Sequence, residues 1–283
     1  MEHADVVRRY LCEPGVEIGA FKSPIPGIKP IYVDRFAEFA NEKTLADYYG
    51  DACDLPFEDS TLNYVASSHL IEHAANPLAA LQEWYRVLRH GGIIYMVVPH
   101  RQRTFDHPRE LTPPAHMIDD YRDGVTQVDG THIEDFVFGV DWLQYSPSTL
   151  VGEIETQQRE RANTYRAAIK EGKEINIHFH TFEPESMVEL LTWANEVLPV
   201  SGRIELIDVI DHFPASTPNG FLVVSHVSKS LLERAQSFHL PWKKGALLKS
   251  DARPLHPSDG EFSAEWVEFV VAARRRLTIC RAV

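Results

Sequence analysis

The sequence predicts an α/β fold with a mostly parallel sheet. Short apolar runs alternate with helical stretches over the first hundred residues, a polar segment follows over residues 100–181, and two more apolar runs come after it. Alternating strands and helices favour parallel pairing, because each crossover helix returns the chain to the same end of the sheet. The 283 residues, 44% of them hydrophobic, suffice for one large domain or two modest ones.

The elements can be assigned in chain order. Four early runs are expected to be strands: GVEIGA (15–20), KPIYVDRF (29–36), LNYVASS (62–68) and GGIIYMVVP (91–99). Between the last two, apolar residues recur at helical spacing, with Asn76 and Pro77 as a start signal and Gly91 as a stop. No third strand is evident between Phe36 and Asp51.

Residues 100–181 are expected to form a polar insertion, or lid, over the edge of the sheet. Two helices are predicted within it, over residues 114–124 and 153–172. A helix over 184–198 and strands over 203–210 and 220–227 should then complete the sheet. The main domain is therefore expected to span residues 1–228, and residues 229–283 a C-terminal extension for packing or dimerisation, with a helix over 263–276.

Charge and composition exclude several classes of function. The formal charge of −13 repels polyphosphate, and the only dense basic run is residues 274–276, so no nucleic acid partner is expected. No apolar run reaches the roughly 18 residues of a membrane span, and the charged N-terminus lacks a signal-peptide core, which predicts a cytoplasmic location. Cys12, Cys53 and Cys280 are odd in number and far apart, so we expect reduced thiols.

Residues 69–73 spell H-x-x-E-H, the zinc-binding helix signature of inverted zinc proteases. That signature needs a continuous helix with both histidines on one face. Here the string follows a strand and precedes a turn at residues 74–77, so His69 is predicted at a strand end, the edge where open α/β sheets bind ligands. We therefore expect a ligand contact and no metal site. For His73, a helix-surface or core position remains an alternative.

The order VEIGA, YVDRF, GDACDLPFEDSTLNYVASSHLIEH, NPLAALQEWYRVLRHGG, IIYMVVP, over residues 14–99, resembles class I S-adenosylmethionine-dependent methyltransferases. More narrowly, GVEIGAFKSP, YVDRF and VPHRQRTFDHPRELTPPAHMIDDY resemble a bacterial subgroup associated with glycan assembly, as far as HFHTFEPES near residue 181. The resemblance implies a Rossmann-like sheet with one antiparallel strand near its C-terminal edge, and S-adenosylmethionine as cofactor.

The same resemblance implies which residues contact the cofactor. Glu17 is expected to meet the methionine ammonium, and Asp34 to accept both ribose hydroxyls. The other expected contacts are Gly19 and Ala20 in the loop after the first strand, Asp51 and Ala52 at the adenine, and Ser68 and His69 near the sulfonium.

Methyl transfer from a sulfonium is an in-line displacement, in which the enzyme positions the acceptor and removes its proton. The expected catalytic residues lie in the insertion: Asp106, His107, His178 and His180. In an extended segment, i and i+2 spacing would put the last two on one face, and the same would hold for His132 and Glu134. A histidine of the 178/180 pair is the expected base, oriented by Asp106. Binding of a divalent metal by the cluster is an alternative.

The sequence thus predicts a cytoplasmic methyltransferase of a small polar acceptor. O-methylation of a sugar or glycan precursor is the first hypothesis, and its acceptor class rests on the resemblance alone. N-methylation of a small amine, and a non-catalytic scaffold subunit that binds the cofactor, are the alternatives. A homodimer is left open.

Overall fold

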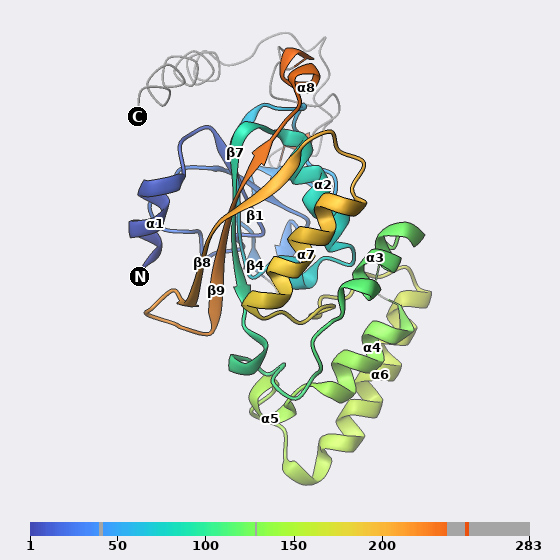
Figure 1. Cartoon of the computed structure of the whole chain (residues 1–283). Helices are drawn as coiled ribbons and strands as arrows, with labels where there is room; N and C mark the ends of the chain where they lie inside the picture. The colour runs from blue at the N-terminus through green and yellow to red at the C-terminus, as the bar shows by residue number, and fades with distance from the viewer. Residues whose placement is uncertain (40–41, 128, 237–246, 249–283) are drawn as a thin grey trace.

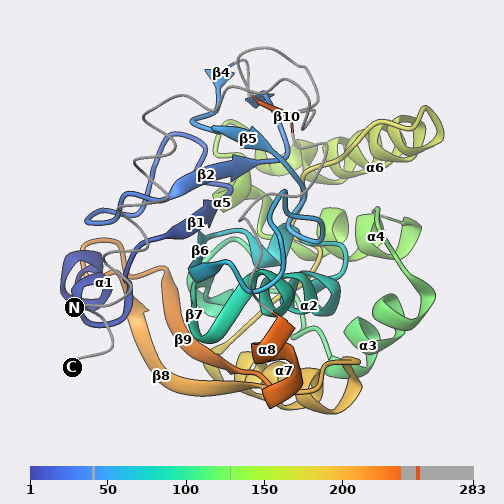
Figure 2. The same ribbon diagram turned by 90° about the horizontal axis from the view of Figure 1, so that it is seen from above.

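The computed structural model describes residues 1–39, 42–127, 129–236 and 247–248. Its centre is an eight-stranded sheet in the order β10-β5-β2-β1-β6-β7-β9-β8 (Figures 1 and 2). The strands of the sheet are β1 Gly15–Ile18, β2 Ile31–Asp34, β5 Tyr48–Tyr49, β6 Leu62–Ser68, β7 Leu88–Pro99, β8 Arg203–Phe213, β9 Gly220–Ser228 and β10 Leu247–Leu248, and a separate hairpin pairs β3 Glu38–Phe39 with β4 Glu42–Lys43.

The pairing directions confirm the predicted sheet. The neighbours β5, β2, β1, β6 and β7 are parallel, whereas β9 runs antiparallel to both β7 and β8. One antiparallel strand therefore lies near the C-terminal edge, as the resemblance implied. Because the parallel strands share one direction, β1, β2 and β6 all end at the same edge of the sheet. The third strand, which the sequence did not reveal, is the two-residue β5.

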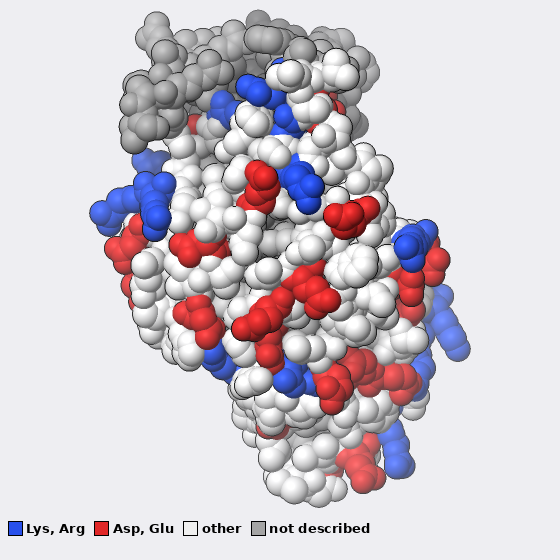
Figure 3. Space-filling view, viewed as in Figure 1, with Lys and Arg blue, Asp and Glu red and all other residues white. Residues whose placement is uncertain are grey.

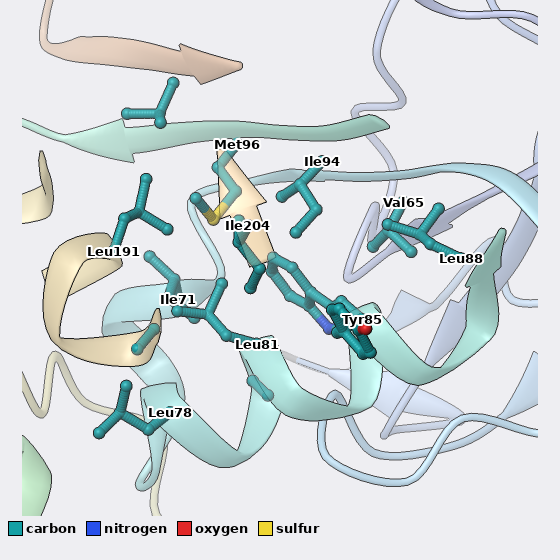
Figure 4. Close-up of a cluster of buried hydrophobic side chains, with 14 of the residues drawn as sticks. Val65, Ile71, Leu78, Leu81, Tyr85, Leu88, Ile94, Met96, Leu191 and Ile204 are labelled. Carbon is teal, nitrogen blue, oxygen red and sulfur yellow. The ribbon is translucent and has the colours of Figure 1, made fainter. Parts of the chain in front are cut away.

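Helices cover the two faces unequally (Figures 1 and 2). The helices are α1 His3–Tyr10, α2 Pro77–Val87, α3 Pro114–Asp123, α4 Gly130–Gly139, α5 Trp142–Tyr145, α6 Ile154–Lys170, α7 Pro184–Val197 and α8 Leu231–Gln236, with 3-10 turns at Ile71–His73, Arg101–Arg103 and Val151–Glu153. On one face, α2 and α7 bury the main core, part of which Figure 4 shows. The other face is packed against α1 through Val6 and Val7.

The connection from β1 to β2 is irregular. Within the described residues 19–30 no helix forms, because Pro24, Pro26 and Pro30 interrupt the segment and Gly27 has a φ of +96°. Ile25 from this loop is buried in the same cluster as α1. The loop beside the expected cofactor site is therefore fixed by tertiary packing, not by a helix.

The predicted helix between β6 and β7 is confirmed as α2, but its expected stop is wrong. The Asn76 side chain accepts a hydrogen bond from the Ala79 N–H at 2.9 Å and caps the helix, with Pro77 in the first turn. The helix ends at Val87, not at Gly91, because Leu88 already pairs with Leu62 of β6.

The insertion, residues 100–181, lies between β7 and α7 and carries four helices, α3 to α6. The predictions of α3 and α6 are confirmed, but reading residues 132–134 as extended is wrong. Those residues lie in α4, which begins because Asp129 Oδ1 accepts the N–H groups of Thr131 and His132. In a helix, positions two apart point in different directions, so His132 is buried and Glu134 is exposed.

Part of the expected C-terminal extension joins the sheet, because β10 pairs antiparallel with β5. The helix predicted over residues 263–276 lies outside the described residues. The expectation of three reduced thiols is wrong at Cys12, which is disulfide-bonded, while Cys53 is free. Among the helices that the structure describes, none is both long enough and apolar enough to cross a bilayer.

Candidate functional site

A cavity of about 880 Å³ lies where β1, β2 and β6 end. Its floor comes from the strand ends and the loops after them: Gly19, Asp34, Asp51, Ala52 and His69. Its roof comes from the insertion: Tyr121, Arg122, Gln127, Lys173, Asn176 and Phe179. Five of the eight expected cofactor residues therefore line one cavity, and the polar insertion faces them.

The buried side chain of Glu17 fixes the loop after β1 through a hydrogen bond to its backbone. This carboxylate is 1% exposed and is absent from the cavity lining. Its Oε1 accepts the Ile25 N–H at 2.8 Å, while Oε2 has no hydrogen-bond partner among the described residues. Burial raises the pKa of Glu17 to about 7. The structure thus places Glu17 behind the loop after β1 and outside the cavity lining, whereas Gly19 lies at the surface of the cavity.

Gly19 has a φ of +70°, and a Cβ there would lie 2.8 Å from Cδ1 of Leu70. Only glycine therefore fits without strain or displacement of Leu70. The backbone at Gly19 is bare towards the cavity, which allows a ligand to approach closely. Ala20 is half-exposed and is absent from the lining.

Asp34 ends β2 and lines the cavity while only 8% exposed. Its Oδ1 accepts the Phe36 N–H at 3.1 Å. Burial raises the pKa of Asp34, and hydrogen bonds from backbone N–H groups, first that of Phe36, oppose that rise. A buried acidic acceptor at this strand end suits the two hydroxyls of a ribose.

The expected adenine loop is fixed from two sides. Asp51 accepts the Cys53 N–H at 2.8 Å and lies 3.1 Å from the Arg35 guanidinium, and the Ala52 carbonyl accepts the Trp84 indole N–H at 3.1 Å. Arg35 also pairs with Glu174 of the insertion at 2.5 Å. The expected adenine loop is thereby anchored to α2 and linked to the roof of the cavity.

At the end of β6, His69 lines the cavity with a φ of +51°, a left-handed conformation that is uncommon for histidine. Its side chain is 36% exposed. Burial, and then the charge of His178, lower the pKa of His69 to about 4. Ser68, which precedes it, is absent from the lining.

The H-x-x-E-H string does not form a continuous helix, which confirms the objection to a protease site. Residues 71–73 make one 3-10 turn after the strand. That turn points His73 into the cavity wall and buries Glu72 completely, and both Glu72 carboxylate oxygens lack a hydrogen-bond partner among the described residues. Burial raises the pKa of Glu72 to about 7 and lowers that of His73 to about 3.

Of the four expected catalytic residues, the structure brings two together. His178 Nδ1 lies 2.5 Å from Asp106 Oδ2, and the other Asp106 oxygen accepts from Arg109 at 2.7 Å. Burial tends to raise the Asp106 pKa, but His178 and Arg109 outweigh it and lower that pKa. His107 instead lies at the surface, with Nε2 2.9 Å from Asp141.

His180 is fully buried in a different group of side chains inside the insertion. His178 meets the H-x-x-E-H turn, because its ring packs edge-on against His73 with centroids 4.7 Å apart. One ligand atom each from Glu72, His73 and His178 lies within 4.8 Å of the others. We call Glu72, His73, His178 and Asp106 the Glu72 cluster. The H-x-x-E-H string could have pointed to the first two members of this cluster. No pattern in the sequence indicated that the roof residues would line the cavity.

Residues 28–96 match a family model described as a methyltransferase domain. An uncharacterised 37.1 kDa protein in transposon TN4556 of Streptomyces fradiae is 31% identical over 107 residues, which cover 34% of this chain and 31% of that protein. The match thus spans about a third of that relative's length.

Solved structures with a similar fold include an S-adenosylmethionine-dependent methyltransferase of Thermotoga maritima, described as a possible histamine N-methyltransferase (17% identity, 81% of this chain and 88% of that one, TM-score 0.41). Another is a methyltransferase of Methanosarcina mazei (16% identity, 81% and 100%, TM-score 0.44). A third is phosphoethanolamine N-methyltransferase 1 of Haemonchus contortus (10% identity, 81% and 42%, TM-score 0.44).

The strand order, with one antiparallel strand near an edge, is that of a Rossmann-like methyltransferase sheet, and residues 28–96 within it match the methyltransferase domain model. The cofactor is S-adenosylmethionine, and the residues that line the cavity fit that molecule. A bare glycine backbone, a buried carboxylate and the expected adenine loop follow one another along the strand ends.

Proposed function

We propose that this protein transfers the methyl group of S-adenosylmethionine to a small polar acceptor. The observation that carries the proposal is the single cavity, in which the cofactor residues of the strand ends face the insertion. At about 880 Å³ it is near the upper end of the roughly 300–1,000 Å³ of small-molecule sites. A cofactor and a small acceptor fit such a volume together.

The proposed base is His73. Its Nδ1 lies 2.9 Å from the Ile177 carbonyl, which requires the proton on Nδ1 and leaves the Nε2 lone pair free. The side chain is 27% exposed and lines the cavity. His178 and Asp106 act as positioning residues, because the His178 ring packs against His73 and Asp106 fixes the His178 ring. His69 is the next candidate for contact with the acceptor.

The proposed acceptor group is a hydroxyl on a sugar or glycan precursor. The roof supplies neutral hydrogen-bonding side chains, Thr126, Gln127 and Asn176, together with the aromatic rings of Tyr121 and Phe179. Amides and hydroxyls bind a polyhydroxylated ring through several hydrogen bonds. A small amine would take the same place in the N-methyltransferase alternative.

Single-turnover methylation tests this assignment. The assay incubates the protein and S-adenosylmethionine with sugars, nucleotide sugars and small amines, and detects products by mass. With a working acceptor, His73→Ala should slow transfer by about 10²-fold without changing cofactor affinity. This is the low end of the usual contribution of a general base, because a pKa of about 3 makes His73 a weak base. His178→Ala and Asp106→Asn should lower kcat less and shift its pH profile.

His107→Ala is the matched control, because this histidine pairs with Asp141 at the surface. Wild-type rates in His73→Ala, His178→Ala and Asp106→Asn would remove the Glu72 cluster from the mechanism. Tight cofactor binding without transfer to any acceptor would favour the scaffold alternative.

A second candidate function is metal-assisted methyl transfer. It is favoured by the convergence of ligand atoms from Glu72, His73 and His178 beside the cavity. A cation there would lower the pKa of an acceptor hydroxyl directly. Transfer abolished by a chelator and restored by magnesium or manganese would support this candidate; transfer that survives chelation would support the His73 base.

A further inference from the structure

A second group of metal-ligating side chains lies inside the insertion, apart from the cavity. His116 and Asp120 lie one turn apart on α3, His132 lies on α4, and His180 lies on the segment that leads to α7. One ligand atom of each is within 4.8 Å of all the others. None of these four residues lines the cavity.

The distances within the group approach those of a tetrahedral metal site. Nε2 of His116 is 3.2 Å from Nε2 of His132. Asp120 Oδ2 is 3.4 Å from Nε2 of His116, 3.8 Å from Nε2 of His132 and 3.9 Å from Nε2 of His180. Four ligands held at 2.0–2.1 Å from a zinc ion would be about 3.3 Å apart. A small contraction around an ion would therefore complete the geometry.

The protein alone leaves part of this group unsatisfied. His180 is 0% exposed, and its Nε2 has no hydrogen-bond partner among the described residues; the same holds for Oδ2 of Asp120. Buried polar atoms nearly always have a partner. The contact between His116 and His132 involves those two rings only, whereas one cation at the centre would also give a partner to Nε2 of His180 and to Oδ2 of Asp120.

The surroundings also fit a cation. Nδ1 of His132 lies 2.8 Å from Asp129 Oδ1, which requires the proton on Nδ1 and turns the Nε2 lone pair towards the group. Such a carboxylate behind a ligating histidine is common at zinc sites. The charges of Asp120 and Asp129 together balance a divalent ion. Three imidazoles and one carboxylate favour zinc over magnesium or calcium, which prefer oxygen ligands.

We propose that one zinc ion is bound by four residues of the insertion: His116, Asp120, His132 and His180. All four positions of the ion are then filled by protein, which is the pattern of structural zinc sites. The ion joins α3 and α4 to the segment before α7. It thereby fixes the roof of the cavity, since Tyr121 and Arg122 follow Asp120 directly on α3.

The test measures bound metal in the full chain, purified without a polyhistidine tag. Elemental analysis and native mass spectrometry should find about one zinc per chain after dialysis. His180→Ala and His116→Ala should each lower the zinc content at least about tenfold, since losing one of a few ligands weakens binding strongly. His107→Ala is the matched control and should retain the zinc.

A second variant guards the test against folding defects, and two further measurements make it independent of turnover. His116 is the most exposed ligand, at 37% of its side chain, so His116→Ala serves if His180→Ala does not fold. Removing zinc with a chelator should lower Tm by about 5 °C or more, and zinc but not magnesium should restore it. Cobalt in place of zinc should give the visible absorption of a tetrahedral site.

Wild-type protein that binds no zinc in a stoichiometric titration would overturn the proposal. So would zinc that persists in His116→Ala and is lost in His73→Ala, because the ion would then occupy the Glu72 cluster. These readouts require no methyl transfer, so their failure would leave the proposed enzymatic function standing.

Discussion

Replacing Asp34 by asparagine changes the charge at the expected ribose contact while keeping the size of the side chain. Asparagine still offers one carbonyl oxygen to the Phe36 N–H, which Asp34 accepts at 3.1 Å. What it loses is an ionised acceptor for the ribose hydroxyls. Hydrogen bonds to charged groups contribute about 1.5–3 kcal/mol each.

Loss of one such bond should weaken S-adenosylmethionine binding by about 10- to 150-fold, since 1.4 kcal/mol is a factor of ten. The lower half of that range is expected, because one carboxylate oxygen of Asp34 already accepts the Phe36 N–H.

Isothermal titration calorimetry with S-adenosylmethionine and S-adenosylhomocysteine measures the change. Asp47→Asn is the matched control, because Asp47 accepts the Tyr32 N–H at 2.9 Å beside the same strand but is absent from the cavity lining. A cofactor analogue that lacks a ribose hydroxyl should show a smaller penalty for Asp34→Asn. A folded Asp34→Asn protein with wild-type affinity would refute the ribose assignment.

Two predictions concern stability. The pKa of Glu17 is about 7 when folded against a reference of 4.5, so between these values the folded state binds more protons, and stability falls as pH rises through that range by up to about 3 kcal/mol. Glu72, whose pKa is also raised to about 7, adds a slope of the same sign. Glu17→Gln should therefore remove about half of the total slope; urea unfolding at pH 5 and pH 8 measures it, and an unchanged slope would contradict the assignment. Gly202→Ala should lower the free energy of unfolding by about 1–3 kcal/mol, because a Cβ there would lie 1.8 Å from the Ser228 carbonyl oxygen. Differential scanning calorimetry measures the change in Tm. Gly152→Ala is the control, because a Cβ at that position meets nothing within 4 Å, and equal Tm values for the two variants would refute the clash.

Surface charge agrees with the composition. In Figure 3 acidic side chains extend across the middle of the face shown, and Lys and Arg are scattered around them. A chain with a formal charge of −13 repels phosphate backbones over such a face. An uncharged or cationic acceptor would meet no such repulsion, which is consistent with either a neutral sugar or a small amine.

Local patterns were enough to predict most of the regular structure. The runs that became β1, β2, β6, β7 and β9 are apolar because these strands are largely buried, and burial leaves its signal within a few residues. The edge strand β8 is mostly exposed, but its run of Ile, Leu and Val was still sufficient to predict a strand. Asn76 and Pro77 marked the start of α2 for an equally local reason, since a cap and a first-turn proline act on adjacent backbone groups. Asp34 could be placed at a strand end on the same grounds.

The sequence alone could not reveal β5 or α4, because a two-residue strand has no periodicity and a polar helix start resembles a loop. It also assigned His178 and His180 to one site from their spacing, whereas tertiary packing separates them. His178 meets Asp106, 72 positions away in the chain, and His180 approaches Asp120. Such meetings depend on how the insertion folds back over the sheet. The sequence by itself therefore predicted most of the sheet and its ligand-binding edge, because strand burial and strand-end residues are local properties. The cofactor followed from the resemblance of residues 14–99 to a known family. Only the tertiary structure decided which side chains converge, because convergence depends on contacts between segments that are distant along the chain.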